Sequence, residues 1–306
     1  MMRRKIAALV LLAVSAFGMS GCSGTPPSPR AMAPTPAPAP RQTLLPFTGL
    51  ESPRDLAVDA VGNVYVADLH HSEDEAGHPY VTTRVIKLPA GSNNPTVLPQ
   101  FVHADLAADS AGAVWVIDAA NQQLVKLAAG SDIQTVLPLP DLGLRGEVLA
   151  VNTAGAAYGI DGGGVYPVGG CCVPVHVVKS EPGSHAPTVL PFTHILGLGG
   201  MAVDAAGNVY VGDFNRVLKL TARADTPTEL PFDLGSVVGV AVDSAGSVYV
   251  VDAERKQVLK LAPGADKPIV LPFTGLNQPV RVAVDAAGSV YVTDVGNHNV
   301  LKLAAA

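Results

Sequence analysis

One short pattern recurs six times between residue 43 and the C-terminus, and this repetition constrains the fold more than any other feature. Each copy reads as an apolar run ending in an acidic or amide residue, a turn with Gly, a Val-Tyr-Val-like run ending in Asp, a loop, Val-Leu-Lys-Leu and Thr-Val-Leu-Pro-Phe. The first polar position holds Asp59, Asp109, Asn152, Asp204, Asp243 and Asp285. The second, nine residues later, holds Asp68, Asp118, Asp161, Asp213, Asp252 and Asp294. Six copies at fixed offsets predict six equivalent structural units.

Each unit is expected to form a four-stranded antiparallel meander, because its four short runs are rich in β-branched and aromatic residues and are separated by turn residues. The turn glycines are Gly62, Gly112, Gly155, Gly207, Gly246 and Gly288. The aromatic position holds Tyr65, Trp115, Tyr158, Tyr210, Tyr249 and Tyr291, and we interpret it as a packing layer between units. The runs are apolar on both faces, so each small sheet must be covered on both sides. Repeats of this kind predict an all-β, six-bladed propeller.

Two positions predict the strand order within a blade. Every first strand has an Ala two residues before its first polar position, as expected where six strands crowd an axis; these are Ala57, Ala107, Ala150, Ala202, Ala241 and Ala283. Every fourth strand is expected to contain a Pro, namely Pro46, Pro99, Pro138, Pro191, Pro231 and Pro272. Because Pro has no N–H to donate, it is tolerated mainly in an edge strand. The fourth strand should therefore be outermost.

The number of proline strands predicts how the ring closes. The first of them, Thr43 to Phe47, comes before any first strand, and the last repeat ends at Leu303 without one. The N-terminal strand should therefore complete the sixth blade. An open β-solenoid is the alternative, but it leaves this count unexplained.

The repeats resemble NHL repeats. The segment 204–213 reads Asp-Ala-Ala-Gly-Asn-Val-Tyr-Val-Gly-Asp, and residues 294–303 read Asp-Val-Gly-Asn-His-Asn-Val-Leu-Lys-Leu. Residues 43–306 as a whole are similar to the extracellular sensor propeller of mycobacterial D-type transmembrane Ser/Thr kinases. This resemblance implies a sensor-type propeller. The sequence departs from those kinases because it contains no kinase signature.

The first 42 residues have the composition of an export signal and a spacer. Arg3, Arg4 and Lys5 precede an apolar run, so residues 1–21 are interpreted as a signal peptide. The sequence Met-Ser-Gly-Cys that ends at Cys22 resembles a bacterial lipobox, which implies a diacylglycerol-type lipid on Cys22. Ordinary cleavage that leaves Cys22 as a free thiol is the alternative. Residues 23–42 contain seven prolines, so the segment 22–42 is interpreted as a lipidated Cys and a stiff linker. We therefore expect an exported protein anchored to the outer face of the cytoplasmic membrane.

The charge balance excludes polyanionic partners. The chain has 20 Lys and Arg residues against 26 Asp and Glu residues, so it has no electrostatic footprint for nucleic acid. We expect contact with the membrane only through the N-terminal lipid, and an unknown protein or cell-wall ligand as the partner.

Length differences between the repeats fall on one face of the expected propeller. The spacing from the second Asp to the following Lys is 19 and 18 residues in blades 1 and 3, and 6 or 8 elsewhere. Loops that vary on a constant scaffold are candidates for binding. The blade 1 insertion, Leu69 to Thr83, contains His70, His71, Glu73, Asp74, Glu75 and His78. These residues could hold a divalent metal or make binding pH-dependent, or they could simply be a solvated polar loop, and we expect no metal.

The blade 3 insertion contains the adjacent pair Cys171 and Cys172, which could form a vicinal disulfide, bridge to another molecule or remain reduced. The six second-strand aspartates also lie on the candidate binding face. A ring of carboxylates could bind a cation or polar ligand, but we favour a structural role in which each Asp caps the turn that follows it.

We interpret the protein as a lipid-anchored binding or sensor propeller that uses the face with the two insertions and has no catalytic residues. The alternative is a metal-dependent enzyme of the lyase or lactonase type, for which His103, His194 and Glu147 are the candidate residues near the axis. A purely architectural surface protein would have the same sequence features.

Overall fold

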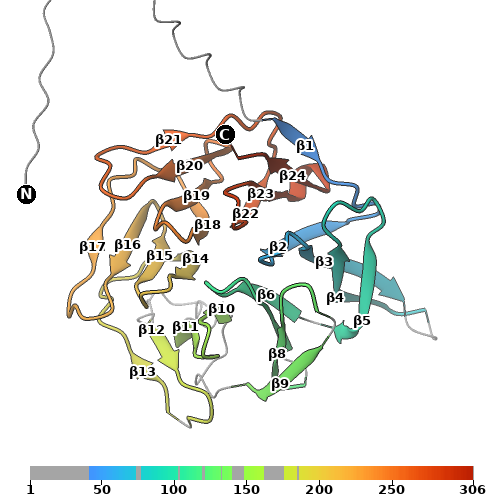
Figure 1. Ribbon diagram of the computed structural model, residues 1–306, viewed down its shortest axis with the longest axis horizontal. Coiled ribbons are helices and arrows are strands. Elements are labelled where there is room, and N and C mark those ends of the chain that lie inside the picture. Colours follow the sequence, from blue (N-terminus) through green and yellow to red (C-terminus); the bar gives the residue numbers. More distant parts are fainter. Residues whose placement is uncertain are drawn as a thin grey trace, which may run out of the picture. The chain divides into compact units, whose positions relative to one another are not determined.

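The computed structural model describes residues 41–73, 77–102, 104–118, 121–131, 133–139, 148–161, 176–184 and 186–305. In this part of the chain, six four-stranded antiparallel sheets surround a common axis (Figure 1). The expected six-bladed all-β propeller is confirmed. The described residues include a single helical turn, η1 (Val295–Asn297), and none of their helices has the length and apolar character needed to cross a bilayer. The predicted signal peptide and Cys22 lie outside the described residues.

Blades 1 to 5 are meanders in chain order from the axis outward, and blade 6 follows the same order except that its outer strand comes from the N-terminus (Figure 1). Blade 1 contains β2 (Ser52–Val58), β3 (Val64–Glu73), β4 (Pro79–Leu88) and β5 (Thr96–Val102). Blade 2 contains β6 (Ala104–Ala108), β7 (Val114–Asp118), β8 (Gln123–Leu127) and β9 (Gln134–Pro138). Blade 3 contains β10 (Val148–Val151), β11 (Ala157–Asp161), β12 (His176–Ser180) and β13 (Thr188–Val189).

The second half of the ring follows the same plan. Blade 4 contains β14 (Leu198–Val203), β15 (Val209–Asp213), β16 (Arg216–Leu220) and β17 (Thr228–Glu229). Blade 5 contains β18 (Val237–Val242), β19 (Val248–Asp252), β20 (Gln257–Leu261) and β21 (Ile269–Val270). Blade 6 contains β22 (Pro279–Val284), β23 (Val290–Asp294), β24 (Asn299–Leu303) and, as its outer strand, β1 (Gln42–Leu44).

The N-terminal strand closes the ring, as the repeat count predicts. β1 pairs antiparallel with β24, with Thr43 opposite Lys302. Beyond the strand, the Leu45 N–H donates to the carbonyl of Val300 at 3.0 Å. The Gln42 side chain also ties β1 to the end of blade 5, because its Oε1 accepts the Thr274 N–H at 2.7 Å. Both ends of the ring are thereby joined in one sheet.

The repeated proline lies at the end of the outer strand rather than always within it. Pro99 and Pro138 belong to β5 and β9, but the other four outer strands end before their proline, so that part of the sequence prediction is wrong. In those four places the residue that follows Pro donates its N–H to the carbonyl of the residue that precedes Pro, at 2.8 Å. The fixed φ of Pro suits such a three-residue turn. Proline therefore ends the outer strand in these blades.

The turn between the first and second strands is the same in all six blades. The N–H of the turn glycine donates to the carbonyl of the first polar residue, and the glycine has a positive φ, as at Gly112 with φ 78°. Gly112 also accepts a hydrogen bond from the Ala60 N–H of blade 1 at 2.9 Å. A Cβ on Gly112 would lie 2.4 Å from the Cβ of Ala60, so only glycine permits this contact between neighbouring blades.

The aromatic position forms the packing layer between blades, as expected. Tyr65 packs with Leu106 and Val114 of blade 2, and Tyr291 of blade 6 packs with Leu56 of blade 1, so the layer continues across the closure. A Lys ammonium lies 4.8 to 5.7 Å from the centre of each aromatic ring. Stacking of a cation on a ring adds attraction to apolar burial. The blades are thus joined by one repeated contact.

The first-strand aspartates complete this layer. The hydroxyls of Tyr210, Tyr249 and Tyr291 donate to the carboxylates of Asp204, Asp243 and Asp285 at 2.8 to 2.9 Å. Trp115 makes the equivalent bond through its Nε1 to Asp109. Burial, reinforced by the neighbouring carboxylates, raises the pKa of the three tyrosines, so they remain hydrogen-bond donors at neutral pH.

Candidate functional site

The propeller has two distinct faces. The first consists of the turns between the first and second strands, and we call it the turn face. The second, which we call the loop face, consists of the connections between blades and the loops between second and third strands. The blade 1 insertion identified in the sequence belongs to the loop face, whereas the blade 3 insertion lies outside the described residues.

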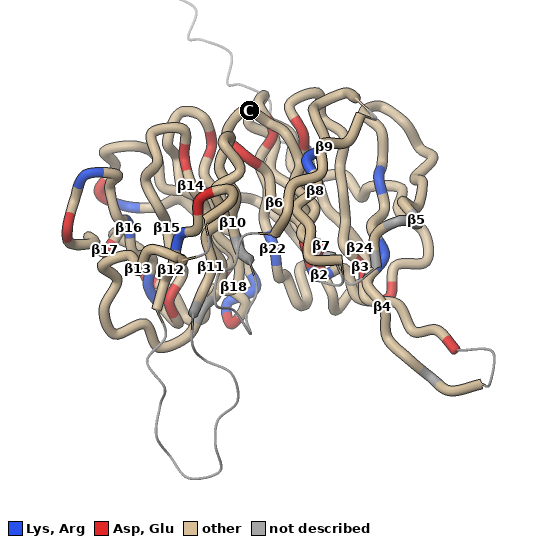
Figure 2. The backbone as a smooth tube through the Cα atoms, turned by 90° about the horizontal axis from the view of Figure 1, so that it is seen from below, with Lys and Arg blue, Asp and Glu red and all other residues tan. Residues whose placement is uncertain are grey.

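The blade 1 insertion lengthens two strands instead of forming a separate loop. β3 and β4 remain paired from Val64 opposite Leu88 to Glu73 opposite Pro79. We call residues 69–83 the arm, and Figure 2 shows it extending away from the ring. Tyr80 and Val81 on the arm are 47% and 43% exposed. The structure therefore presents a two-stranded ribbon with apolar side chains in solvent. Asp74 and Glu75 lie outside the described residues.

The base of the arm is fixed by Glu51. Its Oε2 accepts the backbone N–H of His71 at 2.9 Å and lies 3.0 Å from the Nδ1 of the same residue. The Nδ1 of His70 lies 2.5 Å from the other carboxylate oxygen. The carbonyl of Glu51 contacts the Nδ1 of His298 in blade 6 at 2.5 Å. This cluster joins the arm, the connection into blade 1 and the last blade.

The ordinary pKa of Glu51, about 4.5, is lowered to about 2, chiefly by the backbone N–H of His71 and then by the His71 ring. No group of three His, Cys, Asp or Glu side chains among the described residues has an arrangement that could hold a metal ion. Glu73 and His78 lie on the exposed outer part of the arm.

A Glu51→Gln variant should melt at a lower temperature than the wild type at pH 6. The folded-state pKa is depressed, so the stabilising contribution of the carboxylate is full above about pH 4.5 and is lost as the pH falls through about 2. The difference in melting temperature should therefore shrink across that interval. Calorimetry at a series of pH values measures it, with Glu254→Gln at an exposed position as the control. A difference that persists unchanged to pH 2 would contradict this role for Glu51.

Four of the second-strand aspartates fasten the connection that leads into their own blade. The carboxylate of Asp213 accepts the N–H groups of Leu196 and Gly197 at 2.7 and 3.0 Å, and Arg216 closes the site from the side. The carboxylates of Asp68, Asp252 and Asp294 accept the equivalent pair of hydrogen bonds. In each case the donors are the backbone N–H groups of the residues 17 and 16 positions before the Asp.

Asp118 instead accepts hydrogen bonds from the backbone N–H and from the side-chain amide of Asn121, in the turn after its strand. Asp252 also accepts the backbone N–H of Arg255. The expectation that each Asp caps the following turn is therefore met at Asp118 and Asp252 and wrong at Asp68, Asp213 and Asp294. The backbone of the connection that leads into the first strand donates to the carboxylate at the end of the second strand, because the start of the first strand lies beside the end of the second. Five of these aspartates are at most 2% exposed; the side chain of Asp161 is not described.

The rest of the sequence-based candidates are placed as follows. Residues 162–175 lie outside the described part of the chain, so the expectations for Cys171 and Cys172 remain untested. His103 and Glu147 also lie outside it. His194 has a left-handed backbone conformation, and its carbonyl accepts a hydrogen bond from Arg216.

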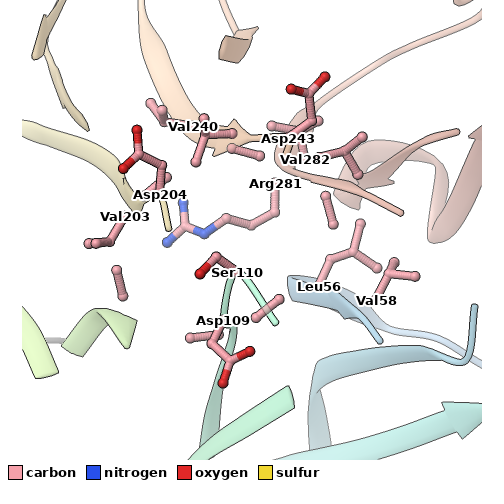
Figure 3. Close-up of a pocket in the computed structure, with 18 of the residues that line it drawn as sticks. Leu56, Val58, Asp109, Ser110, Val203, Asp204, Val240, Asp243, Arg281 and Val282 are labelled. Atoms are coloured by element: carbon pink, nitrogen blue, oxygen red, sulfur yellow. The ribbon is translucent and has the colours of Figure 1, made fainter. Parts of the chain in front are cut away.

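A channel of about 690 Å³ runs along the axis, lined by the first strands and by the turns of the turn face. Figure 3 shows the side chain of Arg281 extending into this space. The Nε of Arg281 lies 3.5 Å from Oδ1 of Asp55. A second cavity of about 470 Å³ adjoins the channel through Arg54, Val238 and Val280.

The sequence analysis missed Glu51, Asp55 and Arg281. The signal for the last two is a charged side chain inside an otherwise apolar first strand, two residues before the repeated Ala. Glu51 carries no such signal, because its partners His71 and His298 come from the insertion and from the far end of the chain.

The comparisons with known proteins agree with this architecture. Residues 276–303, which include β22 to β24, match the NHL repeat. In solved structures, a gluconolactonase from Xanthomonas campestris has a TM-score of 0.60 at 15% identity, covering 87% of this chain and 89% of that chain. A chain of a nidogen–laminin complex has a TM-score of 0.54 at 15% identity, covering 76% and 85%. Virginiamycin B lyase from Staphylococcus aureus has a TM-score of 0.52 at 9% identity, covering 87% and 99%. At these identities the likeness shows the fold alone.

The protein is thus a six-bladed β-propeller that contains an NHL repeat. It is similar to the serine/threonine-protein kinase PknD of Mycobacterium tuberculosis, with 47% identity over 68 residues, or 21% of this chain. The matched segment spans 9% of the length of the kinase.

Proposed function

We propose that this protein is a non-enzymatic binding propeller of the sensor type, which recognises a protein or cell-envelope ligand through its loop face. The observation that carries this proposal is the arm, a paired ribbon that extends from a rigid ring. Tyr80 and Val81 provide exposed apolar contact area, and the exposed His71 lies at its base. Aromatic side chains are frequent anchors in binding surfaces. The blade 3 insertion belongs to the same proposed surface.

The proposal places the propeller outside the cytoplasm, held to the membrane by a lipid on Cys22 and separated from it by the Pro-rich linker. The partial similarity to PknD supports a sensor role, and the signal-like N-terminus supports export.

A lyase or lactonase-like enzyme is the alternative, since solved propellers with those activities share this fold. Such chemistry needs acid–base groups that converge on the axis. Among the described residues, the channel lining contains neither His nor Glu, and its charged groups are Asp and Arg.

Site-specific photo-crosslinking tests the proposal. A photoreactive phenylalanine analogue is placed at Tyr80 in the full chain in living cells, and at Val136, which is 53% exposed on the outer strand β9, as the control. We expect discrete products from position 80 only. Sensitivity of these products to protease or to muramidase then separates a protein ligand from peptidoglycan. Equal products from both positions, or none from position 80, would contradict the proposal.

A second variant separates binding from folding. Because Leu69 pairs with Thr83, residues 70–82 can be replaced by an Asn-Gly turn that closes the hairpin at the edge of the ring. This protein should keep its cooperative melting and compete poorly with the wild type for the crosslinked partner. Full competition without the arm would contradict the role assigned to it.

A further inference from the structure

The channel contains a layer of charges that the repeat pattern does not require. Each first strand contributes one residue two positions before its Ala; in chain order these are Asp55, Asp105, Val148, Gly200, Gly239 and Arg281. The charged members come from blades 6, 1 and 2, which are neighbours across the ring closure. Blades 4 and 5 contribute glycines, because their first strands approach too closely for a side chain: a Cβ on Gly239 would lie 2.7 Å from the carbonyl oxygen of Val280. The layer is therefore charged in blades 6, 1 and 2 and has no side chains in blades 4 and 5.

Arg281 is held in this layer with part of its guanidinium free. Its Nη1 donates to the carbonyl of Val238 in blade 5, and its Nε faces Asp55 in blade 1. Its Nη2 has no hydrogen-bond partner among the described residues, and the side chain is 26% exposed within the channel. An Arg fixed on two sides presents its remaining donors in a defined direction, which suits recognition of a planar anion.

Asp55 acts as a positioning residue for this guanidinium. Its two oxygens accept the N–H groups of Leu56 and Leu106, both at 2.8 Å. The carboxylate is therefore fixed by the backbone of blades 1 and 2. It faces the Nε of Arg281 and leaves the side chain 26% exposed.

The surroundings of Arg281 limit the kind of anion. The channel is also lined by the apolar residues Leu56, Val203, Val240 and Val282, each of which is 5 to 8% exposed (Figure 3). Asp55 and Asp105 in the same layer repel any anion, and they repel a dianion such as a phosphate monoester more strongly than a monoanion whose single charge is paired with Arg281. The turn face ends in acidic turns, whereas the adjoining cavity on the loop face is lined by Arg54 and Lys256. Of the two ends of the channel, the loop face is therefore the more favourable entrance for an anion.

We propose that the axial channel binds a small monoanionic carboxylate with a short apolar body, whose carboxylate pairs with Arg281 and whose body contacts the valine and leucine walls. This site is separate from the arm, so it adds a small-molecule ligand to the binding function proposed above.

Titration of methyl NMR signals with hexanoate tests this site in the whole protein. Hexanoate should shift signals of Val203, Val240 and Val282 in a saturable manner, and neutral hexanamide should bind at least tenfold more weakly. Hexyl phosphate, the dianionic probe, should also bind more weakly than hexanoate. Equal binding of hexanoate and hexanamide would overturn the proposal, because the apolar walls alone would then explain the shifts.

Substitutions at Arg281 give the decisive comparison. Arg281→Met should weaken hexanoate binding at least tenfold, Arg281→Lys should weaken it less, and Arg223→Met, at an exposed position remote from the channel lining, should leave it unchanged. Should Arg281→Met fail to fold, Arg281→Lys still tests the proposal. If that variant bound hexanoate as tightly as the wild type, the guanidinium would not be needed and the proposal would be overturned. Arm crosslinking is measured on the same variants. Loss of hexanoate binding with intact crosslinking is the expected result, and failure of the arm experiment leaves this titration unaffected.

Discussion

Replacing Asp213 by Ala should lower the stability of the propeller by about 3–5 kcal/mol, one of the two largest effects expected for this chain. The carboxylate is fully buried and accepts two backbone N–H groups of the connection between blades 3 and 4. It also pairs with Arg216 at 2.8 Å. Removing it leaves the N–H groups of Leu196 and Gly197 and the charge of Arg216 without their partner. A loss of this size corresponds to a melting temperature lower by about 10 °C.

Calorimetry of three variants checks this role. Asp213→Asn keeps one acceptor oxygen and should fall between the wild type and Asp213→Ala. Asp225→Ala removes an exposed carboxylate one hairpin away and should change the stability by no more than about 0.5 kcal/mol. If Asp213→Ala and Asp225→Ala had the same melting temperature, the second-strand aspartates would not stabilise the connections between blades as their geometry indicates.

The fold was predictable from the sequence because every blade repeats the same demands. Three features recur six times: an apolar run that must be covered on both faces, a Gly that permits the turn, and an aromatic residue between blades. An ambiguous assignment in one repeat can therefore be settled from the other five. Closure followed from the position of Thr43 to Phe47 before the first complete repeat. Where the pattern was wrong, the reason was local: a γ-turn centred on Pro191 or Pro231 ends the outer strand earlier than the apolar run does.

The functional candidates were less predictable because they depend on contacts between distant segments. Glu51 and His298 are 247 residues apart and meet only because the ring closes. Arg281 and Asp55 meet for the same reason, on opposite sides of the seam between blades 6 and 1. The polar residues of the blade 1 insertion suggested a loop, whereas Leu69 to Glu73 continue a strand whose pairing partner is the other half of the same insertion.

The seam between the first and last blades therefore determines both proposed sites. It holds Glu51 beside the last blade at the base of the arm, and it places Asp55 against Arg281 in the channel. β1 is the segment that secures this seam, because it completes the sheet of blade 6. Leu45 and Phe47, which follow it, pack on the cluster that contains Leu50 and Leu56 of the first blade.

Removing this segment should have the second large effect. A chain that begins at Thr48 loses the pairing of β1 with β24, the Gln42 bond to Thr274 and two partly buried apolar side chains. At a net value of about 1 kcal/mol for each hydrogen bond lost, we expect the shortened chain to be less stable by several kcal/mol. It also exposes the edge of β24, which favours association between copies.

The most direct test of the closed ring is calorimetric melting of this shortened chain beside one that begins at Arg41. We expect a single cooperative transition for the chain that begins at Arg41 and a melting temperature lower by about 10 °C for the chain that begins at Thr48. Melting temperatures that agree within about 2 °C would contradict closure by β1, because the lost contacts would then contribute almost nothing.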